Sequence, residues 1–134
     1  MTQVIIHATE NGNVAVTVPT GEISIEAVQA KDTPKGSIIV DASSLPNQHN
    51  DFFDAWELVD DKVEVSLAKA IEITKKRLRA EREPLFAAQD VAFQRAQESG
   101  ADTSAIVAEK QRLRDITKFS ATTLDELRNL KAGV

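Results

Sequence analysis

The chain has 134 residues and no cysteine, and its 16 Lys and Arg against 21 Asp and Glu give a formal net charge of −5. The missing cysteines exclude a disulfide framework and a thiolate metal site. The acidic balance argues against duplex DNA as the main partner, because phosphate binding requires a basic surface. The N-terminal residues do not resemble a signal peptide, and no apolar stretch approaches the ~18 residues needed to cross a bilayer. We therefore expect one soluble domain with an appendage.

Two alternating runs near the N-terminus predict a β-hairpin. Their apolar residues are all even-numbered: Val4, Ile6, Ala8, Val14, Val16 and Val18. A two-residue Asn11-Gly12 loop would place the two apolar rows on opposite faces. A three-residue loop at 10–12 pairs Ala8 with Val14 and keeps both rows on one face. We therefore predict the three-residue loop, with Gly12 in the left-handed conformation.

The following segments predict the rest of a small sheet. A short helix is expected at 23–30, and the composition of 33–36 is typical of a turn. The apolar run at 37–41 predicts a strand buried on both faces and therefore central in the sheet. A final hairpin is expected from strands at 53–58 and 62–65. Residues 1–65 are thus predicted to form a mostly antiparallel sheet with one short helix.

The second half of the chain predicts helices. Ser66 is a favourable N-cap for a helix over 67–98, which would be about 45–50 Å long. Gly100 suits the left-handed C′ position that ends it. A second helix is expected over 102–116, and Thr123 starts a capping-box pattern for a last short helix. The fold class is α+β, with a sheet domain at 1–65 and a helical hairpin plus a C-terminal helix at 66–134.

Apolar residues in these helices follow a repeat of three and four residues. Such stripes are typical of an antiparallel helix pair or of a coiled coil with other chains. Pro84 lies inside the pattern and predicts a kink, which would divide the first helix into segments 67–83 and 84–98. A large buried side chain contributes ~1.5–3 kcal/mol and an exposed ion pair ~0.2–1 kcal/mol, so apolar residues should carry any interface. The predicted partner-binding residues are Leu78, Leu85, Phe86, Phe93 and Leu113.

No group of residues has the spacing of a catalytic or metal site. His7 and His49 are far apart in sequence, and no H-E-x-x-H pattern occurs. Ser43 has no nucleophile-elbow context, and the Asp60-Asp61 pair reads as a turn. The basic cluster at 75–82 reads as a solvated helix face, with contact to an acidic protein surface or to nucleic acid as alternatives. We predict no catalytic residue, no cofactor and no metal.

Two segments carry a family resemblance. Residues 25–36 include A-K-D-T-P-K-G, and residues 39–46 read I-V-D-A-S-S-L-P. Together with Ala55-Trp56-Glu57-Leu58, they resemble small proteins encoded in the tail-fibre region of tailed bacteriophages. In those proteins an A-K-D-x-P-x-G and I-V-D-A-S-x-L-P run precedes a Trp-containing strand. The helical half of the chain, including Lys110-Gln111-Arg112-Leu113-Arg114-Asp115, is similar to the same group.

The resemblance implies a non-enzymatic protein of the virion tail or of fibre attachment. Its partners would be phage tail or tail-fibre proteins, with a homo-oligomer formed through the helices as another arrangement. It would be located in the virion tail, and in the host cytoplasm during assembly, without membrane contact. One alternative is a tail-fibre assembly chaperone that is absent from the mature particle. An alternative of another class is a phage regulatory or nucleic-acid-binding protein that uses the face from Lys75 to Arg82.

Overall fold

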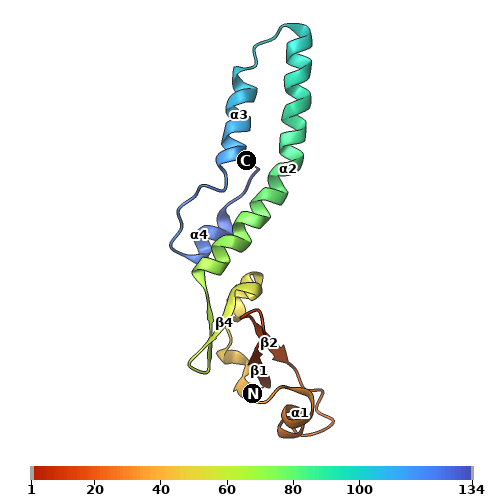
Figure 1. Cartoon of the computed structure of the whole chain (residues 1–134), viewed down its shortest axis with the longest axis vertical. Helices are drawn as coiled ribbons and strands as arrows, with labels where there is room; N and C mark the ends of the chain where they lie inside the picture. The colour runs from red at the N-terminus through yellow and green to blue at the C-terminus, as the bar shows by residue number, and fades with distance from the viewer. Residues whose placement is uncertain (1, 134) are drawn as a thin grey trace. The chain divides into compact units, whose positions relative to one another are not determined.

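A computed structural model describes residues 2–133 and confirms the α+β class, with strands in the first half of the chain and helices in the second (Figure 1). The chain divides into two units, Met1–Ala70 and Ile71–Val134. We call them the sheet unit and the helical unit. The sequence predicts a boundary after Val65. In the structure the first turn of the long helix belongs to the sheet unit, where Lys69 forms an ion pair with Glu57 (3.0 Å).

A three-stranded antiparallel sheet forms the centre of the sheet unit. It contains β1 (Gln3–Ala8), β2 (Val14–Thr17) and β3 (Ile38–Asp41) in the order β2-β1-β3. The prediction that the strand at 37–41 is central was wrong, because β1 lies between the other two. Residues 4–6 of β1 are 0–3% exposed, whereas the apolar residues of β3 are only half-buried.

The first hairpin has the predicted register. Ala8 pairs with Val14 and Ile6 with Val16. Gly12 has a φ of 81°, and its N–H donates to the carbonyl of Thr9 at 3.0 Å. The three-residue loop is therefore confirmed, because it alone places both apolar rows on one face. The ladder ends at the pair of Ile5 with Thr17, so Val18, an apolar residue of the predicted run, lies beyond it.

The two faces of this sheet are covered differently. Helix α1 (Ile25–Asp32) contacts β1 and β3 and buries Val28. It starts two residues later than predicted, because the Ser24 hydroxyl caps it by accepting a bond from the Ala27 N–H at 3.2 Å. On the other face Trp56 joins a buried cluster whose members come from β1, β2 and β4: Val4, Ile6, Val14 and Trp56.

The second sheet is the hairpin of β4 (Trp56–Val59) and β5 (Lys62–Val65). The predicted hairpin is present, but its first strand begins at Trp56 and not at Phe53. Residues Asn47–Ala55 form a 3-10 segment instead, which follows the shorter one at Ala42–Ser44. This segment leads directly into β4. The Trp56 indole N–H donates to the carbonyl of His49, within the segment, at 3.2 Å.

The helical unit contains most of α2 (Leu67–Ser99), together with α3 (Ser104–Asp115) and α4 (Leu124–Asn129). The prediction of two segments divided at Pro84 was wrong, because α2 is one continuous helix. Its axis changes direction along its length in Figure 1, as expected for a helix with an internal proline. Strong helix formers on both sides of Pro84 compensate for the one missing backbone bond.

The predicted helix-end signals are present. Gly100 has a φ of 70° and its N–H donates to Gln97, while the Ala101 N–H donates to the carbonyl of Ala96 at 2.8 Å. These two bonds form a Schellman motif. At α4 the Thr123 hydroxyl accepts a bond from the Glu126 N–H at 3.2 Å, which is the predicted cap. None of the helices within residues 2–133 combines the length and the apolar character needed to cross a membrane.

Candidate interaction surface of the helical unit

Two of the five predicted partner-binding residues lie in the interior of the helical unit. Leu78 of α2 and Leu113 of α3 are both 0% exposed, as is Leu127 of α4. These positions of the stripe are therefore buried within the chain itself, whereas Leu85 is only half-buried. Leu78 and Leu113 build the core, and neither offers surface to a partner.

A network of charged groups holds the C-terminal segment in place. The Glu81 carboxylate accepts hydrogen bonds from Arg77 (2.6 Å) and from the backbone N–H of Ala132 (3.1 Å). Arg77 also donates to the carbonyl of Leu127 (3.1 Å). Arg112 donates to the carbonyl of Ala132 (2.9 Å). These bonds connect α2, α3 and α4 in one structure.

Two carboxylates of the helical unit have lowered pKa values. The hydrogen bond from the Ala132 N–H, followed by the one from Arg77, lowers the pKa of Glu81. The guanidinium of Arg112 lies against Glu109 with an Nη2–Oε1 distance of 2.6 Å, and this hydrogen bond lowers the pKa of Glu109. Both carboxylates are therefore ionised in the folded state over the neutral and mildly acidic range.

The basic cluster at 75–82 is only partly a solvated face. Arg77 and Arg82 both donate to backbone carbonyls; those of Arg82 belong to Leu113 (3.2 Å) and Arg114 (3.3 Å) at the end of α3. Cationic donors commonly satisfy such terminal carbonyls. Lys76 and Arg79 remain exposed. The cluster thus supplies fewer free cations than its sequence indicates.

Phe86 and Phe93, two of the predicted partner-binding residues, are half-buried along one side of α2. The Arg82 guanidinium lies 5.8 Å from the centroid of the Phe86 ring, and the Lys110 ammonium lies 5.0 Å from that of Phe93. Lys110 also forms an ion pair with Asp90 at 2.6 Å. We call the set of Arg82, Phe86, Phe93 and Lys110 the aromatic edge.

The aromatic edge has the chemistry of a protein-binding strip. Its two rings are about 10 Å apart along the helix and face the same side. Aromatic residues and Arg are enriched among residues that dominate binding energy. Both flanking cations already have acceptors within the chain, Arg82 at the end of α3 and Lys110 at Asp90. Leu85, the fifth predicted residue, is also half-buried.

The neighbourhood of each ring was not predictable from sequence spacing. Lys110 meets Phe93 only through the register between α2 and α3, and that register depends on the turn around Gly100. The sequence places Arg82 among the solvated cations, because its bond to α3 joins residues far apart in the chain. Helical periodicity identified the rings and could not identify the cations over them.

The histidines do not form a site. His7 lies on β1 and is half-buried as a residue, and its Nδ1 atom is buried without a hydrogen-bond partner among the described residues. Among residues 2–133 no group of three or more His, Asp or Glu side chains is arranged to hold a metal ion. Comparisons of the chain with protein-family models, with curated proteins and with solved structures give no match.

Proposed function

We propose that this chain is a non-enzymatic protein of the tail region of a tailed bacteriophage, where it acts in the virion tail or in fibre attachment. The aromatic edge of the helical unit is the observation that carries the protein–protein part of this proposal. The phage-tail part is supported by the sequence resemblance at residues 25–36 and 39–46.

The aromatic edge can contribute binding energy because its rings are not yet fully buried. Full burial of an exposed Phe side chain contributes ~1.5–3 kcal/mol, and completing the burial of a half-buried one contributes part of that. The partner is a tail or fibre protein with an apolar surface. Leu85 lies on the same helix and is the remaining predicted contact.

An assembly chaperone uses the same surface but leaves before the particle is complete. The two roles differ in where the protein is found at the end of assembly. Mass spectrometry of purified phage particles measures this directly. A fixed copy number per particle is expected for the tail component. Absence from particles, with presence in the infected-cell lysate, would assign the chaperone role.

Binding at the aromatic edge is tested by pull-down of tail and fibre proteins with the immobilised chain. Phe93→Ala should reduce the recovery of the partner about tenfold, because a large apolar contact is lost. Val91→Ala is the matched control, since Val91 is 48% exposed and lies on the opposite side of α2. Equal recovery by both variants, or no tail or fibre protein with the unmodified chain, would overturn the proposal.

The regulatory alternative is tested with the two exposed cations of the basic cluster. Replacing Lys76 and Arg79 by Glu should leave the pull-down of tail proteins unchanged, because neither residue belongs to the aromatic edge. Binding of the unmodified chain to nucleic acid that weakens steeply with salt, and is lost in this double variant, would support the regulatory role instead.

A further inference from the structure

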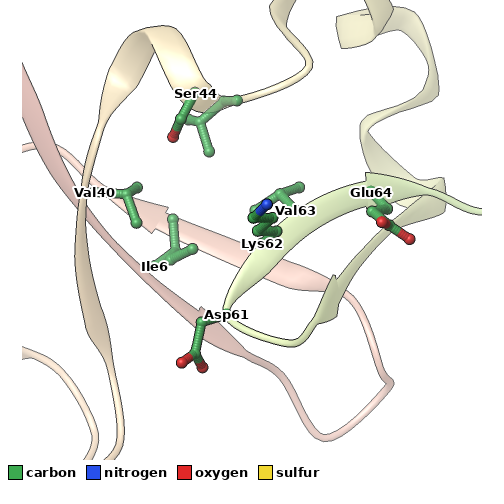
Figure 2. A pocket seen from close by; sticks show the side chains of 8 residues that line it. Ile6, Val40, Ser44, Asp61, Lys62, Val63 and Glu64 are labelled. Carbon is green, nitrogen blue, oxygen red and sulfur yellow. The ribbon is translucent and has the colours of Figure 1, made fainter.

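A cleft of about 370 Å³ opens in the sheet unit beside β5 (Figure 2). Its floor is apolar and its rim carries charged and hydroxyl groups. The residues that line it are Ile6, Val40, Ser44, Leu45, Asp61, Lys62, Val63 and Glu64. Figure 2 shows Ile6 and Val40 opposite the strand that carries Val63. The cleft therefore has one wall made by β5.

That wall is the backbone edge of the strand. Four consecutive residues, 61–64, line the cleft. Successive side chains of a strand point to opposite faces, so side chains alone could contribute only every second residue. A continuous run of lining residues indicates that the main chain itself faces the cleft. Among the described strands β5 pairs only with β4, so this edge has no neighbouring strand.

The alternation of hydrogen-bonded and non-hydrogen-bonded pairs between β4 and β5 shows which backbone groups of β5 point to this edge. Val59 pairs with Lys62 across a two-residue turn, and the Ser66 N–H donates to the carbonyl of Ala55 at 2.8 Å. In an antiparallel ladder the hydrogen-bonded pairs alternate. Glu57 and Glu64 are therefore the next bonded pair, and the N–H and C=O of Val63 point away from β4. These are the groups that an added strand would use.

The free edge of β3 is a weaker candidate for the same role. The Ala42 N–H donates to the carbonyl of Thr2 at 2.8 Å, which sets the phase of that ladder. Asp41 is then directed outward, but its carbonyl already accepts a bond from the Ser44 hydroxyl at 2.7 Å. Local chain therefore occupies part of that edge. Of these two edges, that of β5 is therefore the better place for an added strand.

The charges at the cleft select the composition of the occupant. Asp60, Asp61 and Glu64 are exposed carboxylates at the turn and along the strand, and Lys62 is the one cation among the lining residues. Opposite charges across neighbouring strands stabilise pairing. An added strand with basic residues on its solvent side and aliphatic residues on its cleft side fits both the rim and the floor.

We propose that β5 accepts an extended segment of a partner protein as an added strand, with alternating aliphatic and basic residues. The main-chain bonds of Val63 anchor the segment, and its aliphatic side chains enter the cleft above Ile6 and Val40. This mode of recognition takes its affinity from backbone hydrogen bonds and its specificity from alternate side chains. The surface belongs to the sheet unit and does not depend on the function proposed for the aromatic edge.

The test is amide hydrogen exchange measured by NMR on the full chain. The probe is a blocked seven-residue peptide of alternating lysine and valine. At saturation the Val63 amide should exchange at least about tenfold more slowly, because it gains a hydrogen bond. The Lys62 and Glu64 amides should change little, since the ladder to β4 already bonds them. Unchanged exchange at Val63, or protection confined to the helical unit, would overturn the proposal.

A matched peptide tests the main-chain bonds directly. It has the same sequence with N-methyl groups on alternate residues, which remove the donors of one edge. Its affinity should be at least about tenfold lower if two backbone bonds are lost. Equal affinity of the two peptides would show adsorption by charge alone and would overturn the added-strand mode.

Two variants of the chain complete the test. Val63→Pro removes the outward N–H without removing a bond to β4, and proline is tolerated at such edge positions. It has no amide hydrogen to follow by exchange, so its readout is affinity, and it should bind the peptide about tenfold more weakly. Glu64→Lys, which keeps every backbone group, should weaken binding about fivefold. Glu10→Lys makes the same charge change in the β1–β2 loop and should have no effect. Equal losses in both charge variants would overturn the site.

Discussion

Glu81 connects α2 to the segment that follows α4 through a single carboxylate. One oxygen accepts the bond from Arg77 and the other accepts the bond from the Ala132 N–H. Ala132 is fully buried, so its N–H would be left without a partner if the carboxylate were removed. A charged acceptor at this position is therefore worth more to the fold than its place on a mostly polar helix indicates.

The Glu81 contacts predict an acid-dependent part of stability. Folding lowers the pKa of Glu81 from its ordinary value of 4.5, so its contribution is present above about pH 4.5 and is lost as the pH falls through the lower folded value. Glu81→Gln should lower the melting temperature at pH 7. It should also reduce the further loss between about pH 5 and pH 3. Thermal unfolding at pH 7 and across the range from about pH 5 to pH 3 measures this, with Glu83→Gln as the exposed control. A parallel pH dependence in all three proteins would contradict the prediction.

The turn between β4 and β5 contains a second informative pair of residues. Asp60 and Asp61 have φ values of 49° and 65°, which is the conformation of a type I′ turn. Asp tolerates this region less well than Gly does. The turn is therefore formed at some cost, which is repaid by the Val59–Lys62 pairing.

Asp61→Gly should stabilise the sheet unit by about 0.5–1 kcal/mol, since glycine adopts a positive φ without steric cost. Asp61→Ala removes the same charge but should destabilise the unit, because alanine is strained there. Urea unfolding followed by Trp56 fluorescence separates the two effects. If both variants shift the midpoint in the same direction, charge and not backbone conformation controls the turn.

At the scale of elements, local signals determined the parts of the fold that the sequence predicts well. The parity of apolar residues gives the first hairpin its register, and Gly100 and Thr123 mark helix ends. Strand order depends on contacts between distant segments, so the run at 37–41 was expected at the centre and is found at the edge. The Lys110–Phe93 contact also joins distant segments, so it could not be predicted from the sequence. The outward direction of the Val63 N–H depends on the register of β4 and β5, which is known only once the turn between them is known.

The end of α2 provides a test of one such local signal. Gly100→Ala should lower the free energy of unfolding by about 1 kcal/mol, because a side chain is strained at its φ of 70°. Gly133→Ala is the control, since Gly133 has open space around it and no positive φ. It should stay within about 0.5 kcal/mol of the unmodified chain. Circular dichroism during urea unfolding measures both, and equal effects would refute a special role for Gly100.

At the scale of the whole molecule, each unit has its own buried centre. Trp56 is the single tryptophan and belongs to the core of the sheet unit, whereas Leu78, Leu113 and Leu127 are buried in the helical unit. Indole fluorescence therefore reports on one unit, and helical ellipticity reports mainly on the other. The chain offers an internal comparison without added probes.

Leu113→Ala should destabilise the helical unit by about 2–5 kcal/mol, the usual cost of a cavity at a fully buried leucine. The ellipticity midpoint in urea should fall, and the fluorescence midpoint should stay close to that of the unmodified chain. Val14→Ala, in the sheet core, should have the opposite pattern. Midpoints that move together in both variants would show that the two cores unfold as one cooperative unit.

The binding of Ala132 on both sides also decides how the chain can be handled. Its N–H donates to Glu81 on α2 and its carbonyl accepts from Arg112 on α3, so the backbone at Ala132 is held between two helices. A fluorescent label or affinity handle attached next to Ala132 would compete with these two bonds. A label in the exposed loop between β1 and β2, far in sequence from Ala132, leaves both bonds in place and is the better choice for capture experiments.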